Sequence, residues 1–123
     1  MKKQIFQIGL ISLLFLISSC SGGSSYDSEN LNEFAQCITE NGAKMYGAYW
    51  CSYCNSQKNM FDNSWEYIDY IECSLPNQGG QTQHCIEQGI TGYPTWEFED
   101  GTRLSGALSF GDLASKTGCQ TPS

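Results

Sequence analysis

The sequence predicts an α/β fold in which a shortened mixed sheet of about four strands is flanked by helices. Three observations predict it. An apolar run over residues 45–50 leads into Cys51-Ser52-Tyr53-Cys54 and then into a helix-compatible segment, residues 55–61. Residues 67–73 alternate as a strand does. Asp100-Gly101 is a strong hairpin signal between two further short strands.

The first predicted element is a helix over residues 29–40, whose apolar side chains share one face at helical spacing. Ser28 is its expected N-cap, and Asn41-Gly42 ends it. The other expected elements, in order, are a strand at 43–50, the helix at 55–61, a strand at 67–73, a loop at 75–80, a short helix at 81–88, a strand around 96–98, a turn at 99–102, a return strand at 103–105 and a helix at 109–116.

Residues 1–20 are predicted to be a lipoprotein signal peptide. Lys2 and Lys3 precede an apolar stretch, which ends in small residues before Cys20. This pattern resembles a bacterial lipobox, in which the cysteine is lipidated. An ordinary signal peptide and an uncleaved anchor are the alternatives. We therefore expect an extracytoplasmic protein, attached by Cys20 to the periplasmic face of a bacterial membrane.

The rest of the chain divides into a Ser/Gly-rich flexible tether at 21–28, one domain at 29–119 and a short tail at 120–123. Without Lys2 and Lys3 the chain has 4 basic and 13 acidic residues, a net charge of −9. This charge argues against nucleic acid as a partner and against electrostatic docking on anionic lipid. Seven cysteines in so short a chain indicate an oxidising compartment.

Cys51 and Cys54 form a Cys-x-x-Cys dithiol where a strand meets a helix. Unpaired N–H groups and the positive end of the helix dipole favour a thiolate at the first position. We expect Cys51 to attack and Cys54 to resolve the mixed disulfide, with no metal or organic cofactor. Half of a zinc site and a structural disulfide are the alternatives. Because the chain has no second Cys-x-x-Cys and one histidine, His84, the pattern favours redox chemistry.

Tyr93-Pro94-Thr95 is the second part of the predicted site. A proline at the start of a central strand is tolerated where the preceding peptide is cis. The backbone of Tyr93 would then be free to pair with an extended substrate segment, although an ordinary trans turn is the alternative. The residues expected to shape the substrate groove are Trp50, Ser52, Tyr53, Tyr93, Pro94 and Thr95. We interpret His84 as a solvated surface residue, and core packing is an equal account of Trp50 and Trp96.

Residues 50–54 together with 92–95 resemble the thioredoxin superfamily, and the match extends from about residue 31 to 119. More narrowly, residues 34–37, 42–48 and 92–96 are similar to the thioredoxin-like domain associated with vitamin K epoxide reductase homologues. The resemblance implies a thioredoxin-like fold. It also implies that the protein passes disulfides between client proteins and a quinone-linked membrane oxidoreductase, here as a lipid-tethered domain on its own.

The sequence departs from thioredoxin at three places. Ser52-Tyr53 replaces Gly-Pro between the cysteines, Met45 occupies the position of a buried aspartate, and the first strand is missing. The resemblance therefore does not imply a proton relay of the thioredoxin kind.

Four cysteines remain as candidates for structural disulfides. Cys73 and Cys85 are spaced as in the related domains, and a bridge between them would contribute about 3 kcal/mol by closing a short loop. Cys37 and Cys119 lie near helix ends, which a thioredoxin-like topology brings to the pole opposite the dithiol, so a second bridge is expected. The competing hypothesis is that Cys73–Cys85 relays electrons to Cys51–Cys54.

The sequence thus predicts a thiol–disulfide oxidoreductase acting on protein thiols and disulfides. Disulfide donation is the favoured direction. A reductase for cytochrome maturation or an isomerase is the runner-up. A non-catalytic binding lipoprotein with three structural disulfides is the alternative from a different functional class.

Overall fold

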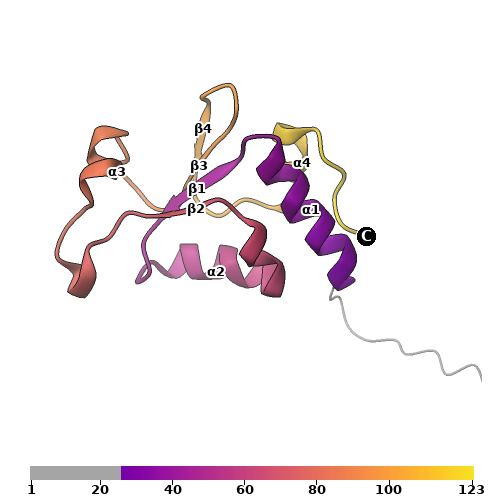
Figure 1. The fold of residues 1–123 in the computed structure, drawn as a ribbon, viewed down its shortest axis with the longest axis horizontal. Helices are drawn as coiled ribbons and strands as arrows, with labels where there is room; N and C mark the ends of the chain where they lie inside the picture. Colours follow the sequence, from indigo (N-terminus) through magenta and orange to yellow (C-terminus); the bar gives the residue numbers. More distant parts are fainter. Residues whose placement is uncertain (1–25) are drawn as a thin grey trace, which may run out of the picture.

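The structure of the protein is a computed structural model that describes residues 26–123 (Figure 1). The predicted signal peptide, Cys20 and residues 21–25 of the predicted tether lie outside the described residues. The described chain begins with helix α1 (Ser28–Glu40), strand β1 (Lys44–Gly47) and helix α2 (Ser52–Phe61). It ends with strand β4 (Arg103–Ser105) and helix α4 (Phe110–Thr117).

The middle of the chain consists of shorter elements. The 3-10 helix η1 (Asp62–Tyr67) follows α2 directly and leads to strand β2 (Tyr70–Glu72). A second 3-10 helix, η2 (Pro76–Gln78), and helix α3 (Gln83–Glu87) precede strand β3 (Thr95–Glu97).

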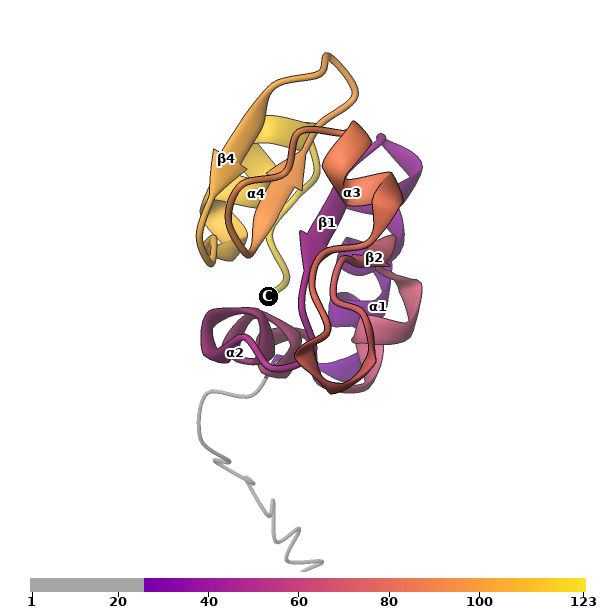
Figure 2. The same ribbon diagram turned by 90° about the vertical axis from the view of Figure 1, so that its left-hand side faces the viewer.

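The four strands form one mixed sheet in the order β2-β1-β3-β4. The central strand β1 runs parallel to β2 and antiparallel to β3, and β3 forms an antiparallel hairpin with β4. Helices flank this sheet, with α1 and α4 together at one end and α3 at the other (Figure 1). The turned view shows β4 and α4 on one side of β1, and β2 and α3 on the other (Figure 2). The predicted fold class is confirmed, and the architecture is thioredoxin-like.

The two faces of the sheet bury separate apolar clusters, because successive side chains of a strand point to opposite faces. Met45 and Trp96 belong to the larger cluster, which takes side chains from α1, α2 and α4. Phe34, Phe61 and Phe110 meet there with ring centroids 5.0–6.2 Å apart. Tyr46 points to the other face and belongs to the smaller cluster, which contains Cys73, Cys85 and Ile90.

Several element boundaries differ from those predicted. The side chain of Asp27, and not that of Ser28, caps α1 by accepting the N–H of Glu29 at 3.2 Å. The strand predicted at 43–50 ends at Gly47, because a turn closes between the N–H of Cys51 and the carbonyl of Ala48. The helix α2 begins at Ser52, directly after Cys51, which agrees with the prediction that Cys51 lies at its N-terminus. The 3-10 helix η1 was not predicted.

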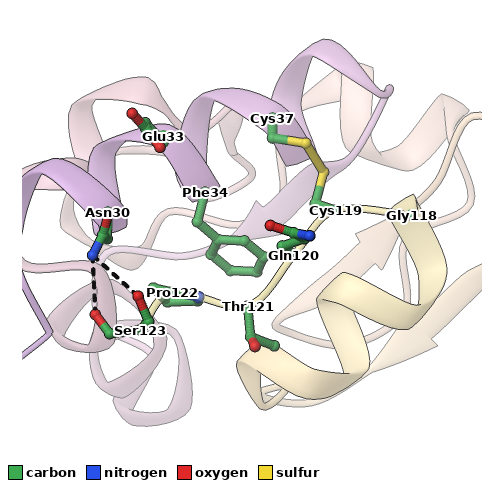
Figure 3. A pocket seen from close by; sticks show the side chains of 10 residues that line it. All are labelled: Asn30, Glu33, Phe34, Cys37, Gly118, Cys119, Gln120, Thr121, Pro122 and Ser123. Atoms are coloured by element: carbon green, nitrogen blue, oxygen red, sulfur yellow. Dashed lines mark hydrogen bonds between the residues drawn. A yellow bond between two sulfur atoms is a disulfide. The ribbon is translucent and has the colours of Figure 1, made fainter.

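The predicted tail packs on the domain (Figure 3). Pro122 is buried, and the side-chain amide of Asn30 donates to the carbonyl and hydroxyl oxygens of Ser123, both at 3.2 Å. A cavity of about 380 Å³ lies between this tail and α1, beside the Cys37–Cys119 bridge. Within residues 26–123, no helix combines the length and the apolar character needed to cross a bilayer.

Candidate active site

Cys51 occupies the N-cap of α2. Strand β1 ends at Gly47, and the turn at residues 48–51 then leads the chain into the helix. The Sγ atom of Cys51 accepts the backbone N–H of Cys54 at 3.2 Å. This is the bond that an N-cap side chain makes to the first turn, and a thiolate accepts it more strongly than a thiol. Cys51 is buried but keeps 8% of its surface exposed, whereas Cys54 has none exposed.

Cys54 lies behind Cys51, one helical turn along α2, and it is fully buried. Burial raises the pKa of the Cys54 thiol to about 12, and the hydrogen bond and charge of Cys51 act in the same direction. Lys58 and a backbone hydrogen bond at Ala48 act in the opposite direction but do not offset the burial. The two sulfurs of the dithiol therefore have different environments: Cys51 caps the helix and keeps some exposed surface, whereas Cys54 is fully buried and protonated.

Exposed aromatic side chains lie on both sides of Cys51 in the sequence. Tyr49, Trp50 and Tyr53 are exposed, Tyr53 to 68%, although each is a large apolar residue. The indole of Trp50 donates to the hydroxyl of Ser74 at 2.8 Å and meets the ring of Tyr93 edge-on at 5.9 Å. Trp50 thus links the dithiol turn to two other loops. Trp96 is fully buried and belongs to the core, so of the two tryptophans only Trp50 lies at the surface of the site.

The loop before β3 supplies the other predicted groove residues. The Tyr93–Pro94 peptide is cis, Pro94 and Thr95 are buried, and Tyr93 is half-buried. The hydroxyl of Thr95 donates to the carbonyl of Gly92 at 2.8 Å, which closes the loop on itself. Within residues 26–123 no backbone group bonds to the N–H or the carbonyl of Tyr93. Of the residues predicted to shape the groove, four therefore have side chains at the surface: Trp50, Ser52, Tyr53 and, in part, Tyr93. Pro94 and Thr95 are buried behind them.

The four remaining cysteines are bonded in two disulfides. One joins Cys37 to Cys119, and the other joins Cys73 to Cys85. Both sulfurs of Cys73–Cys85 are fully buried, so they offer no surface for exchange with the dithiol. Cys51 and Cys54 are the free cysteines among the described residues. Nor does any group of three His, Cys, Asp or Glu side chains in that part of the chain stand ready to hold a metal ion.

The Cys73–Cys85 bridge closes a loop that contacts the dithiol turn at two points. Ser74 accepts from Trp50, and the N–H of Gln78 donates to the hydroxyl of Tyr49 at 2.9 Å. Sequence reasoning missed Ser74 and Gln78, because nothing in a Pro/Asn/Gly loop indicates which residues it contacts. His84 is exposed and stacks on Tyr46 with 6.3 Å between ring centroids, on the sheet face opposite Met45 and Trp96.

Three further residues of the site were also missed. Gln57, a residue of α2, is fully buried, and its side chain forms hydrogen bonds with Trp96 and Leu108. Tyr70 and Glu72 lie on β2 near Cys54, and their side chains bond each other at 3.2 Å. The alternating pattern of residues 67–73 predicted the strand but not which other element its side chains would meet.

The segments around the dithiol contain no acidic or basic side chain over residues 48–57, 73–82, 91–96 and 104–109. The carbonyl of Pro94 and the amide of Gln57 hold the last of these segments to the others. These segments are therefore polar, aromatic and neutral, whereas the charged side chains of Lys58 and Glu72 lie just outside them.

No family model matches the sequence. A search of known proteins finds similarity to the thiol-disulfide oxidoreductase LTO1 of Arabidopsis thaliana, at 37% identity over 99 residues. The alignment covers 77% of this chain but 26% of that protein, so the chain spans about a quarter of its relative's length. Most of this thioredoxin-like domain is thus similar to one part of a thiol-disulfide oxidoreductase.

Proposed function

We propose that the protein is a thiol–disulfide oxidoreductase that exchanges disulfides with other proteins through Cys51 and Cys54. The observation that carries the proposal is the pairing of a helix-capping Cys51, which keeps 8% of its surface exposed, with a fully buried Cys54 one turn behind it. This arrangement gives one sulfur for attack and a second for release. The similarity to a thiol-disulfide oxidoreductase over 99 residues supports the same chemistry.

The exchange has two steps in each direction. When the dithiol is oxidised, a client thiolate attacks Cys51 Sγ, and Cys54 leaves as a thiolate. A second client thiolate then attacks the client sulfur of the mixed disulfide, which forms the client disulfide and returns reduced Cys51. In the reverse direction Cys51 attacks a client disulfide, and Cys54 releases the client thiol. Tyr93 would pair with an extended client segment beside Cys51, since its backbone groups are unengaged.

We further propose that the protein works outside the cytoplasm as a lipoprotein anchored through Cys20, and that it donates disulfides. Two internal disulfides accompany the dithiol, which supports an oxidising compartment. A quinone-linked membrane oxidoreductase of the vitamin K epoxide reductase type would reoxidise it. Labelled palmitate should then enter the wild-type protein and not the Cys20→Ala variant, and equal labelling of both would contradict the anchor.

The direction of exchange follows from the reduction potential of the dithiol. A potential near −120 mV is that of an oxidant, and one near −270 mV is that of a reductant, on the scale of known oxidoreductases. We expect the protein to lie nearer the first value when equilibrated with glutathione. A value near the second would replace donation with reduction, and the dithiol would serve cytochrome maturation or a similar pathway.

The Cys54→Ala variant tests the exchange itself. Without Cys54, a client captured by Cys51 is not released, so mixed disulfides should accumulate in cells and be identified by mass spectrometry after non-reducing electrophoresis. Cys51→Ala is the matched control and should trap nothing. If Cys54→Ala traps no protein, and iodoacetamide at neutral pH leaves Cys51 unmodified in the wild type, the domain is a non-catalytic binding module.

A further inference from the structure

Release of a captured client requires Cys54 to lose a proton. The thiolate, not the thiol, attacks a disulfide, and burial holds the pKa of Cys54 at about 12. Met45 packs beside the site on β1 and has no group that could accept a proton. A proton acceptor supplied by the protein would therefore come from another element, and the adjacent strand β2 carries the candidates.

The register of the parallel pair β1–β2 places two polar side chains on the sheet face that Cys54 contacts. Met45 pairs with Tyr70, and Gly47 pairs with Glu72. Paired residues of neighbouring strands point to the same face, and residues two apart on one strand also share it. A Cβ on Gly47 would lie 3.1 Å from Cys54 Sγ, so this face is the one against which Cys54 packs.

Tyr70 connects this face to a carboxylate. The same Cβ on Gly47 would lie 2.9 Å from Cε2 of Tyr70, so the phenol ring and the sulfur of Cys54 both border the space above Gly47. The hydroxyl of Tyr70 donates to Oε1 of Glu72 at 3.2 Å, and Oε2 of Glu72 accepts the N–H of Ser74 at 3.1 Å. Burial raises the pKa of Tyr70, with Glu72 acting in the same direction, so Tyr70 stays a neutral hydrogen-bond donor.

We propose that Glu72, acting through Tyr70, accepts the proton of Cys54 when Cys54 attacks the mixed disulfide at Cys51. This inference rests on the proposed exchange function and names a residue pair that serves its second step. Glu72 is a positioning residue in this role, because its contact is with Tyr70 and not with the reacting sulfurs.

The step balances in both directions. The Cys54–H bond breaks, the proton goes to the Glu72 carboxylate along the Tyr70 hydroxyl or a solvent molecule, and the sulfur electron pair attacks Cys51 Sγ. The Cys51–Cys54 bond forms, and the client leaves as a thiolate. In disulfide donation Cys54 is the leaving group, and the same proton returns to it from Glu72.

Four ionisable groups act on this step. Cys51 and Lys58 come from α2, and Tyr70 and Glu72 come from β2, whereas β1 contributes Met45 and Gly47. The ammonium of Lys58 lies 4.1 Å from the centroid of the Tyr70 ring and favours a thiolate at Cys54. Lys58 thus stabilises the charge that forms, but an ammonium group has donors and no acceptor for the proton.

Stopped-flow reaction of the reduced protein with 5,5′-dithiobis(2-nitrobenzoate) separates the two steps, because attack by Cys51 and attack by Cys54 each release one coloured thiolate. In the wild type we expect the second-phase rate to level off near neutral pH, because a carboxylate accepts the proton. In Glu72→Gln we expect it to fall at least about tenfold at pH 7 and to rise in proportion to hydroxide up to about pH 9, since a general base contributes 10²–10⁴-fold. The first phase should stay within about twofold of the wild type in this variant.

Three more variants define the comparison. Tyr70→Phe should slow the second phase, and adding it to Glu72→Gln should cause little further loss, because the two residues act in series. Glu72→Asp keeps a carboxylate and should restore the levelling of the pH profile. Glu87→Gln removes an exposed carboxylate on α3 and should behave as the wild type.

Each result bears on one claim. If Glu72→Gln keeps a wild-type second phase and pH profile, Glu72 is not the acceptor, while the exchange function stands. If Glu72→Gln slows both phases equally without changing the pH profile, the residue only supports the loop at Ser74, and the inference fails. If the wild type itself shows no second phase, the proposed exchange function fails instead.

Discussion

Gly47 illustrates how one residue determines the geometry of the dithiol. It stands at the end of β1, between Tyr70 and Cys54, and any side chain there would meet both at 2.9–3.1 Å. Real Cβ atoms do not approach other atoms so closely without displacement, so a larger residue would push the resolving sulfur or the ring away. The absence of a side chain lets Cys54 lie directly on the sheet, next to the polar pair on β2.

Gln57 has a comparable role at the other end of the site. Its carboxamide oxygen accepts from Trp96 Nε1 at 3.1 Å and from the N–H of Leu108 at 2.6 Å, and its amide donates to the carbonyl of Leu108 at 3.0 Å. The side chain is fully buried, and all three partners are satisfied by it. A helix residue that resembles a surface glutamine in the sequence thus anchors the chain at residue 108.

Replacing Gln57 by Leu should destabilise the protein by roughly 2–4 kcal/mol, since it leaves buried donors and an acceptor without partners. Urea unfolding followed by tryptophan fluorescence measures the loss. The exposed Gln88, at the C-terminal cap of α3, provides a matched control, and Gln88→Leu should change the free energy of unfolding by less than about 0.5 kcal/mol. A Gln57→Leu variant as stable as the wild type would show that the amide network contributes nothing net.

At the level of elements, β3 and β4 show how a sequence can specify a structure locally. Asp100-Gly101 predicted the hairpin, and the return strand lies at residues 103–105 as predicted. The register then aligns Lys44 of β1, Glu97 of β3 and Arg103 of β4 in one row across the sheet. Glu97 binds Lys44 at 3.3 Å and Arg103 at 2.7 Å.

Glu97→Gln should lower the free energy of unfolding by about 1 kcal/mol at pH 7, because cross-strand ion pairs contribute on that scale. Burial of Glu97 opposes its ionisation, but the hydrogen bonds and charges of Arg103 and Lys44 outweigh it and hold its pKa below the ordinary value. A lowered pKa means that this stability is present above pH 4.5 and is lost as the pH falls through the folded-state value.

The difference between the wild type and Glu97→Gln should therefore shrink when unfolding is measured at about pH 2–3 instead of pH 7. Glu99→Gln, on the same hairpin but exposed, should show no such change. A difference that stays constant between the two pH values would mean that the Glu97 charge does not act through its pairs.

The element boundaries show where prediction from the sequence failed. The apolar pattern at 43–50 extended the predicted strand too far, because Tyr49 and Trp50 are apolar in composition yet exposed at the site. The dithiol, its helix and the Tyr93-Pro94 loop were predictable, since each depends on adjacent residues. Tyr70 and Glu72 were not, because their position depends on the pairing of β2 with β1, and the pattern of either strand alone does not contain that register.

At the scale of the molecule, the two disulfides support different regions. Cys37–Cys119 joins the last turn of α1 to the segment just after α4 (Figure 3). In the same region the side chain of Asn41 donates to the carbonyl of Thr117 at 2.9 Å. The bridge closes most of the domain, because the bonded cysteines are 82 positions apart in the sequence. Cys73–Cys85 closes 12 residues and holds the loop that contacts Tyr49 and Trp50. One bridge therefore constrains the whole chain, and the other constrains the wall of the dithiol.

Removing each bridge should separate stability from reactivity. Closure entropy grows with loop length, so Cys37→Ala/Cys119→Ala should lose up to about 4.5 kcal/mol and Cys73→Ala/Cys85→Ala about 3 kcal/mol. The rate of iodoacetamide alkylation at Cys51 should respond in the opposite order. It should stay within about twofold of the wild type in the first variant, since that bridge contacts α1 and α4 but not the dithiol turn.

In the second variant the alkylation rate should change by more than about threefold, because Trp50 and Tyr49 lose a fixed partner loop next to Cys51. Ser74→Ala is a milder test that keeps both disulfides and removes only the bond from Trp50, and it should change the rate in the same direction. Should the Cys73→Ala/Cys85→Ala variant alkylate as the wild type does while Cys37→Ala/Cys119→Ala does not, the division of roles between the two bridges would be the reverse of the one inferred from their contacts.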